Sequence, residues 1–220
     1  VLIDHHLHPP VDGYAVQFSD THACSTSYIV YQLLEALAGT DAIDQAMAES
    51  LYVGIMTDTG NFSFSSLTSD LFRAVAVLID KGVNVPYVNS SVYNNFSEGR
   101  MRLLGYMLND KMVTDYEFGV AYVSLTEEEM RRFDFIQGDS EGFVNYPLSI
   151  RGIRMSAMFI QTKHSIRVSL RSRGEVDVNV FARRYFDGGG HRNAAGGKSY
   201  VPMNETLENF RKYLREYFGA

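Results

Sequence analysis

Three consecutive residues near the start of the chain, Asp4-His5-His6, combine a carboxylate with two imidazoles. They follow the apolar run Val1-Leu2-Ile3, which is typical of a buried strand. The carboxyl ends of strands in open α/β sheets face the ligand crevice. Imidazole and carboxylate groups at such an edge can supply a metal ligand and the partner that orients it. The tripeptide therefore predicts a metal site, and a pair of ordinary surface histidines is the competing interpretation.

A second carboxylate, Asp58, lies in the sequence Thr57-Asp58-Thr59-Gly60. It follows the apolar segment 51–56, which does not alternate and so predicts a strand that is covered on both faces. If this strand runs parallel to the opening one, Asp58 emerges at the same sheet edge as His5. A carboxylate at that edge can bridge two divalent ions. Taken alone, an aspartate that caps the next turn is the simpler interpretation.

The other histidines near the start of the sequence and the single cysteine give weaker indications of a functional site. We interpret His8 and His22 as loop residues. Cys24 has no arrangement of nucleophile and base around it in the sequence, so we interpret it as a small buried or half-buried residue.

Three consecutive glycines, Gly188, Gly189 and Gly190, precede His191 and Arg192. Glycines let the backbone approach a ligand closely and turn its N–H groups toward an anion, and the two following side chains add donors. Small residues continue to position 197, so a helix that started there would point its positive end at a phosphate. The segment predicts an anion site, with a flexible loop as the competing interpretation.

Positive charge gathers between residues 151 and 192. This segment holds eight Arg and one Lys against three acidic residues, a net charge of +6, although the whole chain carries −6. Within it, Arg171 and Ser172 end an alternating strand, and a guanidinium can bind phosphate through two hydrogen bonds. The overall charge argues against a general binder of long nucleic acid. The local charge suits a small anionic ligand, unless it is a solvated face that is balanced elsewhere in the fold.

The elements that must position these residues indicate two domains. The opening strand, helices over 27–37 and 42–50, the strand 51–56 and a helix over 69–81 predict a parallel sheet flanked by helices, an α/β domain over residues 1–96. A linker helix, 97–110, would join it to a smaller α+β domain over 111–220 with a mixed sheet. The strands expected there are 111–116, 120–125, 154–161 and 166–170. The helices expected there are 178–185 and 205–218, the second capped by Asn204.

The composition is that of a globular protein, with 45% hydrophobic and 21% charged residues. No apolar run reaches 18 residues, so we expect no membrane span. A single cysteine suits a reducing cytoplasm, and no export signal opens the sequence. Because Val1 already reads as part of a strand, we expect the natural N-terminus to lie upstream.

Together these motifs resemble those of the DHH phosphoesterase superfamily. Asp4-His5-His6 matches its name-giving tripeptide, and residues 57–60 look like its last metal motif. The glycine segment, with residues 169–172, resembles the associated C-terminal substrate domain. Residues 23–37 and 141–145 are similar to the nanoRNase branch of bifunctional oligoribonucleases and pAp phosphatases. The superfamily carries further metal-binding Asp and His residues upstream of the tripeptide, and this sequence starts too late to contain them.

The resemblance implies a phosphoesterase that uses two divalent ions, most commonly Mn²⁺. It implies that His5 and Asp58 bind metal, that Asp4 orients His5, and that His6 contacts the scissile phosphate. The residues expected to hold the other phosphate or the terminal nucleotide are Arg171, Ser172, Gly188, Gly189, Gly190, His191 and Arg192. The implied substrates are short single-stranded RNA and 3′-phosphoadenosine 5′-phosphate (pAp), without long duplexes or a membrane partner. A homodimer is one of the oligomeric states that the sequence leaves open.

Three alternatives remain at this point. One is a pyrophosphatase or polyphosphatase of the same superfamily, against which the glycine segment counts. Another is a phosphodiesterase for cyclic dinucleotides. The third is a nucleotide or nucleic-acid binding module whose metal half is degenerate.

Overall fold

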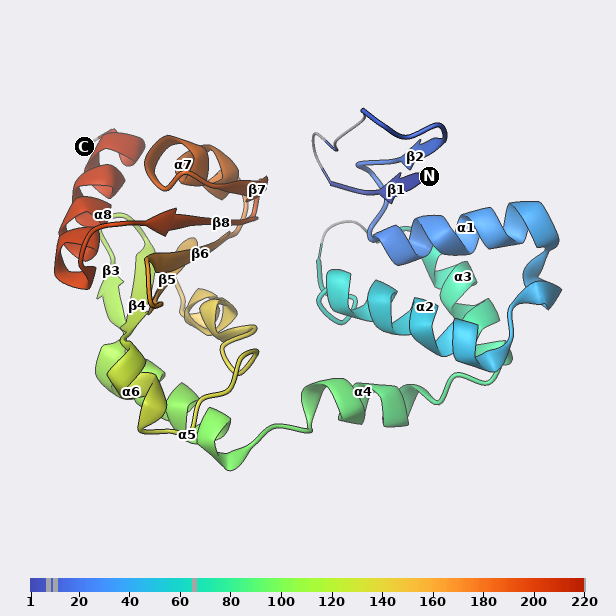
Figure 1. Cartoon of the computed structure of the whole chain (residues 1–220), viewed down its shortest axis with the longest axis horizontal. Helices are drawn as coiled ribbons and strands as arrows, with labels where there is room; N and C mark the ends of the chain where they lie inside the picture. The colour runs from blue at the N-terminus through green and yellow to red at the C-terminus, as the bar shows by residue number, and fades with distance from the viewer. Residues whose placement is uncertain (7–8, 10–11, 65–66, 220) are drawn as a thin grey trace. The chain divides into compact units, whose positions relative to one another are not determined.

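In a computed structural model, the chain divides into two units, Val1–Asn95 and Phe96–Ala220, and each contains its own hydrophobic core (Figure 1). The structure describes residues 1–6, 9, 12–64 and 67–219. The predicted fold class is confirmed, because the first unit is α/β with parallel strands and the second is built on a mixed sheet.

The first unit combines a short parallel sheet with helices. Strand β1 (Leu2–Asp4) pairs in parallel with β2 (Gln17–Ser19), which the sequence did not predict. The helices that follow are α1 (Thr26–Ala38), η1 (Thr40–Ala42), α2 (Gln45–Asp58), α3 (Ser69–Asp80) and α4 (Val85–Tyr93). Apolar side chains of α1, α2 and α3 form the core of this unit, and Ile3 of β1 packs against it.

The predicted strand 51–56 was wrong, because these residues are the second half of helix α2. The side chain of Asp44 accepts a hydrogen bond from the backbone N–H of Met47 and begins this helix. The buried residues follow the helical period, and they are Ala48, Leu51, Tyr52, Ile55 and Met56. This period continues across the expected boundary without a turn signal, so the apolar run belongs to one helix.

The second unit is built on a six-stranded mixed sheet with the order β3-β4-β5-β6-β8-β7. Its strands are β3 (Val113–Asp115), β4 (Val120–Leu125), β5 (Met155–Gln161), β6 (Ile166–Ser172), β7 (Gly189–His191) and β8 (Ala194–Ser199). Only β4 and β5 run parallel, and the other neighbours are antiparallel. The expected helix after the glycines was wrong, because those residues form the hairpin β7–β8, where Gly189 lies opposite Gly196.

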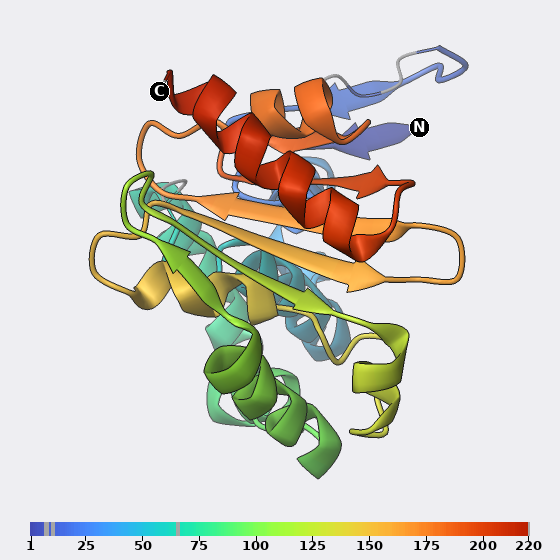
Figure 2. The same ribbon diagram turned by 90° about the vertical axis from the view of Figure 1, so that its left-hand side faces the viewer.

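Helices cover both faces of this sheet (Figure 2). Helices α7 (Val178–Tyr185) and α8 (Met203–Phe218) pack on one face, where Phe181 and Phe210 are fully buried. The other face is covered by α5 (Glu98–Tyr106), η2 (Met107–Lys111), α6 (Glu127–Arg131) and η3 (Phe143–Ser149). Helix α5 was expected as a linker, and its residues Leu103 and Leu104 contribute to the core of the second unit.

Two helix starts differ from the sequence interpretation. Helix α8 begins at Met203 after Pro202, and no side chain caps it, so the expected cap at Asn204 was wrong. The ring of Pro202 fixes φ before the first turn, but it carries no oxygen that could accept a backbone N–H of that turn. Helix α4 was not predicted; the side chain of Asn84 caps it and Pro86 stands in its first turn.

Candidate active site

The structure brings His5 and Asp58 together, although they are 53 positions apart in the sequence. His5 directly follows β1, and Asp58 is the last residue of α2. The imidazole Nε2 of His5 lies 3.7 Å from the carboxylate Oδ2 of Asp58. The side chain of His5 is 14% exposed and that of Asp58 is 46% exposed, so the pair borders solvent. The expected proximity therefore holds, although a helix end rather than a second strand supplies the carboxylate.

The neighbouring backbone orients the imidazole of His5. Its Nδ1 lies 3.4 Å from the carbonyl oxygen of Ala23, in the segment that leads into α1. When Nδ1 carries the proton and donates to this carbonyl, Nε2 presents its lone pair on the side of Asp58. A carbonyl on the far ring nitrogen is a usual partner of a metal-binding histidine.

Asp4 holds His6 instead of His5. One oxygen of its carboxylate, Oδ1, lies 2.6 Å from Nδ1 of His6 and also accepts the backbone N–H of His6 at 3.1 Å. The expectation that Asp4 orients His5 was wrong, because side chains of adjacent residues after a strand diverge and the carboxylate reaches the residue two positions on. The hydrogen bond to His6 lowers the pKa of the Asp4 carboxyl, which therefore stays ionised. The rings of His5 and His6 meet edge to face, with centroids 4.6 Å apart.

A tight turn fixes the end of α2 and with it Asp58. The buried hydroxyl of Thr59 donates to the carbonyl of Ile55 at 2.7 Å and accepts the backbone N–H of Phe62 at 3.1 Å. Gly60 has a φ of 57°, and a Cβ at this position would overlap the ring of Phe64. The sequence after Asp58 is thus a left-handed turn that stops the helix and presents the carboxylate.

Close contact between α1 and α2 supports this arrangement. A Cβ placed on Gly54 would overlap the hydroxyl of Ser27, so glycine is required where the two helices approach. Cys24, just before α1, is 5% exposed, and burial raises the pKa of its thiol. This agrees with a structural role for Cys24. His22 is exposed on the same segment, and His8 lies outside the described residues.

The donor set near His5 fits a divalent cation. Imidazole nitrogen and carboxylate oxygen are ligands that transition metals accept. Two ligands of one ion, each about 2.0–2.2 Å from it, lie about 3–3.5 Å apart. The 3.7 Å between His5 and Asp58 is close to this spacing, so a small closing movement would allow both to bind one ion.

The glycines of the second unit are placed where backbones approach closely. A Cβ on Gly188 would overlap the carbonyl oxygen of Gly196 across the hairpin. Gly190 has a φ of 151°, and a Cβ there would lie 2.5 Å from the carbonyl oxygen of Ala194. Gly189 differs, because a Cβ at this position would meet its nearest atoms only at 3.5 Å. Packing therefore explains two of the three glycines and leaves Gly189 unexplained.

The predicted anion-binding side chains have different surroundings. Ser172 is buried; its hydroxyl donates to the carbonyl of Val176 at 2.6 Å and accepts the amide of Asn193 at 2.9 Å. Arg192 is exposed and forms an ion pair with Glu175. These contacts fix the turn between β6 and α7 and the tip of the hairpin.

Two of the predicted residues, Arg171 and His191, are half-buried on strands of the sheet. Arg171 is half-buried on β6, opposite Ala194 of β8, and its Nη1 donates to the carbonyl of Leu170 at 2.9 Å. Burial lowers the pKa of its guanidinium. His191 ends β7 and is half-buried.

Sequence reasoning missed Asn179 and Arg183 on α7. The side-chain oxygen of Asn179 accepts the backbone N–H of Gly190 at 3.0 Å and Nε of Arg183 at 3.1 Å. The spacing of four residues on a predicted helix was the available signal for this pair. Their contact with the glycines, eleven positions away from Asn179, could not be read from the sequence.

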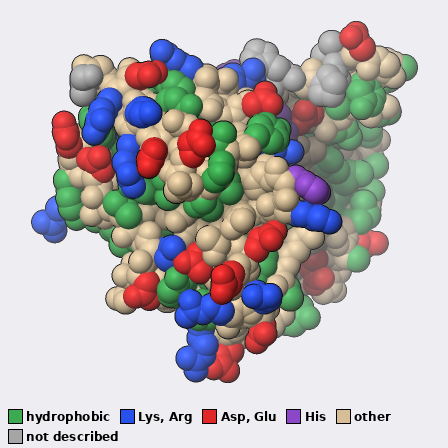
Figure 3. Space-filling view, turned by 60° about the vertical axis from the view of Figure 1, so that its left-hand side comes forward, with side chains coloured by type: hydrophobic (Ala, Val, Ile, Leu, Met, Phe, Trp, Pro, Cys, Tyr) green, Lys and Arg blue, Asp and Glu red, His purple; other side chains and the backbone are tan. Residues whose placement is uncertain are grey.

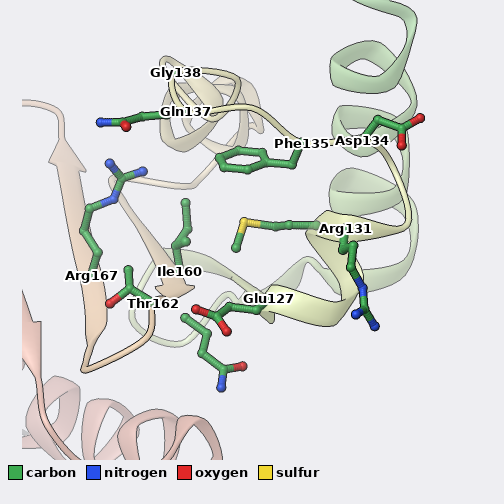
Figure 4. A pocket seen from close by; sticks show the side chains of 11 residues that line it. Glu127, Arg131, Asp134, Phe135, Gln137, Gly138, Ile160, Thr162 and Arg167 are labelled. Atoms are coloured by element: carbon green, nitrogen blue, oxygen red, sulfur yellow. The ribbon is translucent and has the colours of Figure 1, made fainter.

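A separate cavity of about 680 Å³ lies at another edge of the second unit (Figure 4). Phe135 and Ile160 point into it, and the guanidinium of Arg167 stands at its side near Gln137. Arg167 donates to the hydroxyl of Ser140 at 2.8 Å. None of the predicted site residues lines this cavity.

The surface of the second unit carries both signs of charge. Figure 3 shows Lys and Arg side chains interspersed with Asp and Glu on the face it draws. Arg184 lies 4.0 Å from a carboxylate oxygen of Glu216, and Arg167 lies 4.0 Å from one of Glu141. Part of the positive charge between residues 151 and 192 is thus balanced locally. No helix of the described residues is both long and apolar enough to cross a membrane.

Comparisons with known proteins agree with this description of the second unit. The DHHA1 domain matches residues 116–220. The bifunctional oligoribonuclease and PAP phosphatase NrnA of Bacillus subtilis (strain 168) is 32% identical over 203 residues, which cover 90% of this chain and 62% of that protein. The cyclic-di-AMP phosphodiesterase GdpP of the same strain is 28% identical over 227 residues, which cover 99% of this chain and 32% of that protein.

A solved structure extends the agreement to both units. The crystal structure of an exopolyphosphatase-related protein from Bacteroides fragilis has a TM-score of 0.92 and 40% sequence identity. The match covers 98% of this chain and 63% of that one. The chain spans less than two thirds of the length of each of these proteins.

Proposed function

Because the chain belongs to the DHH phosphoesterase superfamily, we propose that it is a metal-dependent phosphoesterase that hydrolyses short oligoribonucleotides to mononucleotides and pAp to AMP. The observation that carries the proposal is the meeting of His5 and Asp58 at 3.7 Å. The similarity to a B. subtilis oligoribonuclease and PAP phosphatase over 90% of the chain supports the substrate class.

His5 and Asp58 would hold the metal, with the carbonyl of Ala23 fixing the ring of His5. We propose Mn²⁺, bound as a pair of ions, because the motifs around His5 and Asp58 resemble those of the DHH superfamily, and the carboxylate oxygen is a ligand that suits this cation. Bound there, the metal would supply Lewis acidity and lower the pKa of a water molecule toward neutrality.

His6 would stabilise charge on the phosphate that is cleaved. Its ring stands edge to face with that of His5, and the carboxylate of Asp4 holds its Nδ1. This carboxylate fixes the orientation of the His6 ring, so that Nε2 would be presented to a phosphoryl oxygen of the substrate. Asp4 is thus a positioning residue, and His6 is the group that touches substrate.

The second unit would bind the part of the substrate that is not cleaved. Arg171 contributes positive charge on β6, and the hairpin at Gly188 to His191 presents backbone with little side chain above it. Ser172 and Arg192 would support this surface indirectly, because their hydrogen bonds fix the neighbouring turns.

Cyclic-dinucleotide hydrolysis is a second candidate, favoured by the 28% identity to a cyclic-di-AMP phosphodiesterase over 99% of the chain. The two activities share the chemistry of phosphodiester cleavage and differ in the shape of the substrate. Rates measured side by side on linear pApA and on cyclic di-AMP distinguish them. A higher kcat/KM on the cyclic compound would favour the second candidate.

The direct test is hydrolysis of pApA by the complete protein in the presence of Mn²⁺. We expect Asp58→Ala to lower kcat at least about 100-fold, because it removes a proposed metal ligand. Asp70→Ala is the matched control, since Asp70 is an exposed aspartate of the same unit that pairs with Arg73. Undiminished turnover by Asp58→Ala would contradict the proposed site. Nucleotide binding without turnover by the wild type would favour a binding module instead.

A further inference from the structure

Near the glycine hairpin, the guanidinium of Arg183 is held through its Nε. Arg192, which the sequence suggested, is paired with Glu175. The structure shows Arg183 exposed at the end of α7, with Nε donating to Asn179. Within the described residues, no carboxylate and no other hydrogen bond occupies its two terminal nitrogens. Both terminal nitrogens of Arg183 can therefore bind an incoming anion.

Asn179 fixes this guanidinium next to the glycines. One oxygen, Oδ1, accepts both Nε of Arg183 at 3.1 Å and the backbone N–H of Gly190 at 3.0 Å. A Cβ placed on Gly189 would lie 3.5 Å from Nε and 3.6 Å from Nη2 of Arg183. The arginine thus faces Gly189 directly, with no side chain between them.

Packing does not require glycine at position 189. Its backbone is not left-handed, and a Cβ there would make only ordinary contacts, unlike one at Gly188 or Gly190. A methyl group at this position would occupy the space beside the guanidinium. The missing side chain keeps that space open for a ligand.

We propose that Arg183, positioned by Asn179, binds a phosphate group of the substrate other than the one that is cleaved, in the space beside Gly189. This inference rests on the proposed function and adds the residue that recognises the second phosphate. A planar guanidinium held at Nε presents its two terminal nitrogens for a bidentate contact with phosphate oxygens. The substrates favoured by this contact carry a terminal phosphate.

The test compares two dinucleotides that differ only in that phosphate, pApA and ApA, with the complete protein. We expect Arg183→Gln to raise the KM for pApA about tenfold, the usual effect of losing a charge-assisted hydrogen bond, and to change the KM for ApA less than about twofold. The kcat on both should stay near that of the wild type. Arg183→Lys should restore part of the preference for pApA, because it keeps the charge.

Arg184→Gln is the matched control, because Arg184 is the next residue of α7 and lies near Glu216. Gly189→Ala is a second variant; it should keep the melting temperature of the wild type and weaken binding of pApA. An equal KM rise for both dinucleotides, or identical behaviour of the Arg183 and Arg184 variants, would overturn the inference. If the wild type cleaves neither dinucleotide, the proposed function itself fails, so the two failures are distinguishable.

Discussion

At the scale of single residues, two neighbouring histidines of the first unit have different partners. His5 faces Asp58 and is oriented by a backbone carbonyl, whereas His6 is held by the carboxylate of Asp4. A carboxylate on Nδ1 of an imidazole fixes the tautomer and supports a positive charge on the ring. In the proposed function, His5 would therefore serve as a metal ligand while His6 would contact substrate.

Asp4→Asn tests this division. We expect kcat for pApA to fall at least about 100-fold, the range seen when a positioned proton donor is lost, with a smaller change in KM. Asp20→Asn is the control, because the exposed Asp20 receives the backbone N–H of His22 in the same unit. Steady-state kinetics with Mn²⁺ present measure both variants. A kcat for Asp4→Asn within twofold of the wild type would show that His6 does not depend on Asp4.

Only some of the residues in the candidate site could be predicted from the sequence. The tripeptide and Asp58 could be named because their residue types are rare in combination and follow apolar segments. The partner of Asp4 could not be predicted, because it depends on the direction of the chain after β1. Asn179 and Arg183 were missed for a similar reason, since polar residues on a helix surface are ordinary until the hairpin is known to touch them.

At the scale of elements, the carboxylate of Glu129 fixes the start of helix α6. Glu129 accepts the backbone N–H and the hydroxyl of Thr126, which closes a capping box at the start of the helix. It also pairs with Lys111 at 2.6 Å and accepts the hydroxyl of Tyr106 at 2.7 Å. Burial opposes ionisation, but these hydrogen bonds together lower the pKa of Glu129 to about 2. The carboxylate thus ties α6 to the elements before β3.

This pKa predicts an acid-sensitive second unit. Because the folded pKa lies below the ordinary value of 4.5, the stabilisation is present above about pH 4.5 and is lost as the pH falls toward 2. Glu129→Gln should lower the free energy of unfolding at pH 7 by about 3 kcal/mol and reduce its loss in acid. Urea unfolding at pH 7 and pH 3 measures this. The neighbour Glu128→Gln should change little, and equal effects of the two variants would refute the assignment.

Helices and strands could be predicted where the apolar residues followed one clear periodicity, either that of a helix or that of a strand. Strand β6 appeared where the alternation was clean, and helix α7 appeared where the helical repeat was clean. The run 51–56 was misread because a buried helix can look like a buried strand when it is cut into short windows. The hairpin β7–β8 was read as a helix start because glycines rarely mark strands. Close backbone approaches, of Gly188 to Gly196 and of Gly190 to Ala194, explain two of the glycines, and only the structure shows them.

At the scale of the whole molecule, two units with separate cores carry two kinds of residue. The first unit holds the histidines and the carboxylate that would bind metal, and the second holds the arginines and the glycine hairpin. This division explains why the charge is uneven along a chain whose net charge is −6. It also means that metal binding and phosphate recognition can be impaired by separate substitutions, each in a unit with its own core.

The most direct test of the account is Mn²⁺ binding by the complete protein, measured by calorimetry or by the electron paramagnetic resonance signal of the free ion. Wild type and the His22→Ala control should bind with the same affinity, because His22 is exposed and lies outside the proposed ligand set. His5→Ala and Asp58→Ala should each weaken binding at least about tenfold. Unchanged affinity in both variants, with the fold intact, would show that these two side chains do not form the metal site.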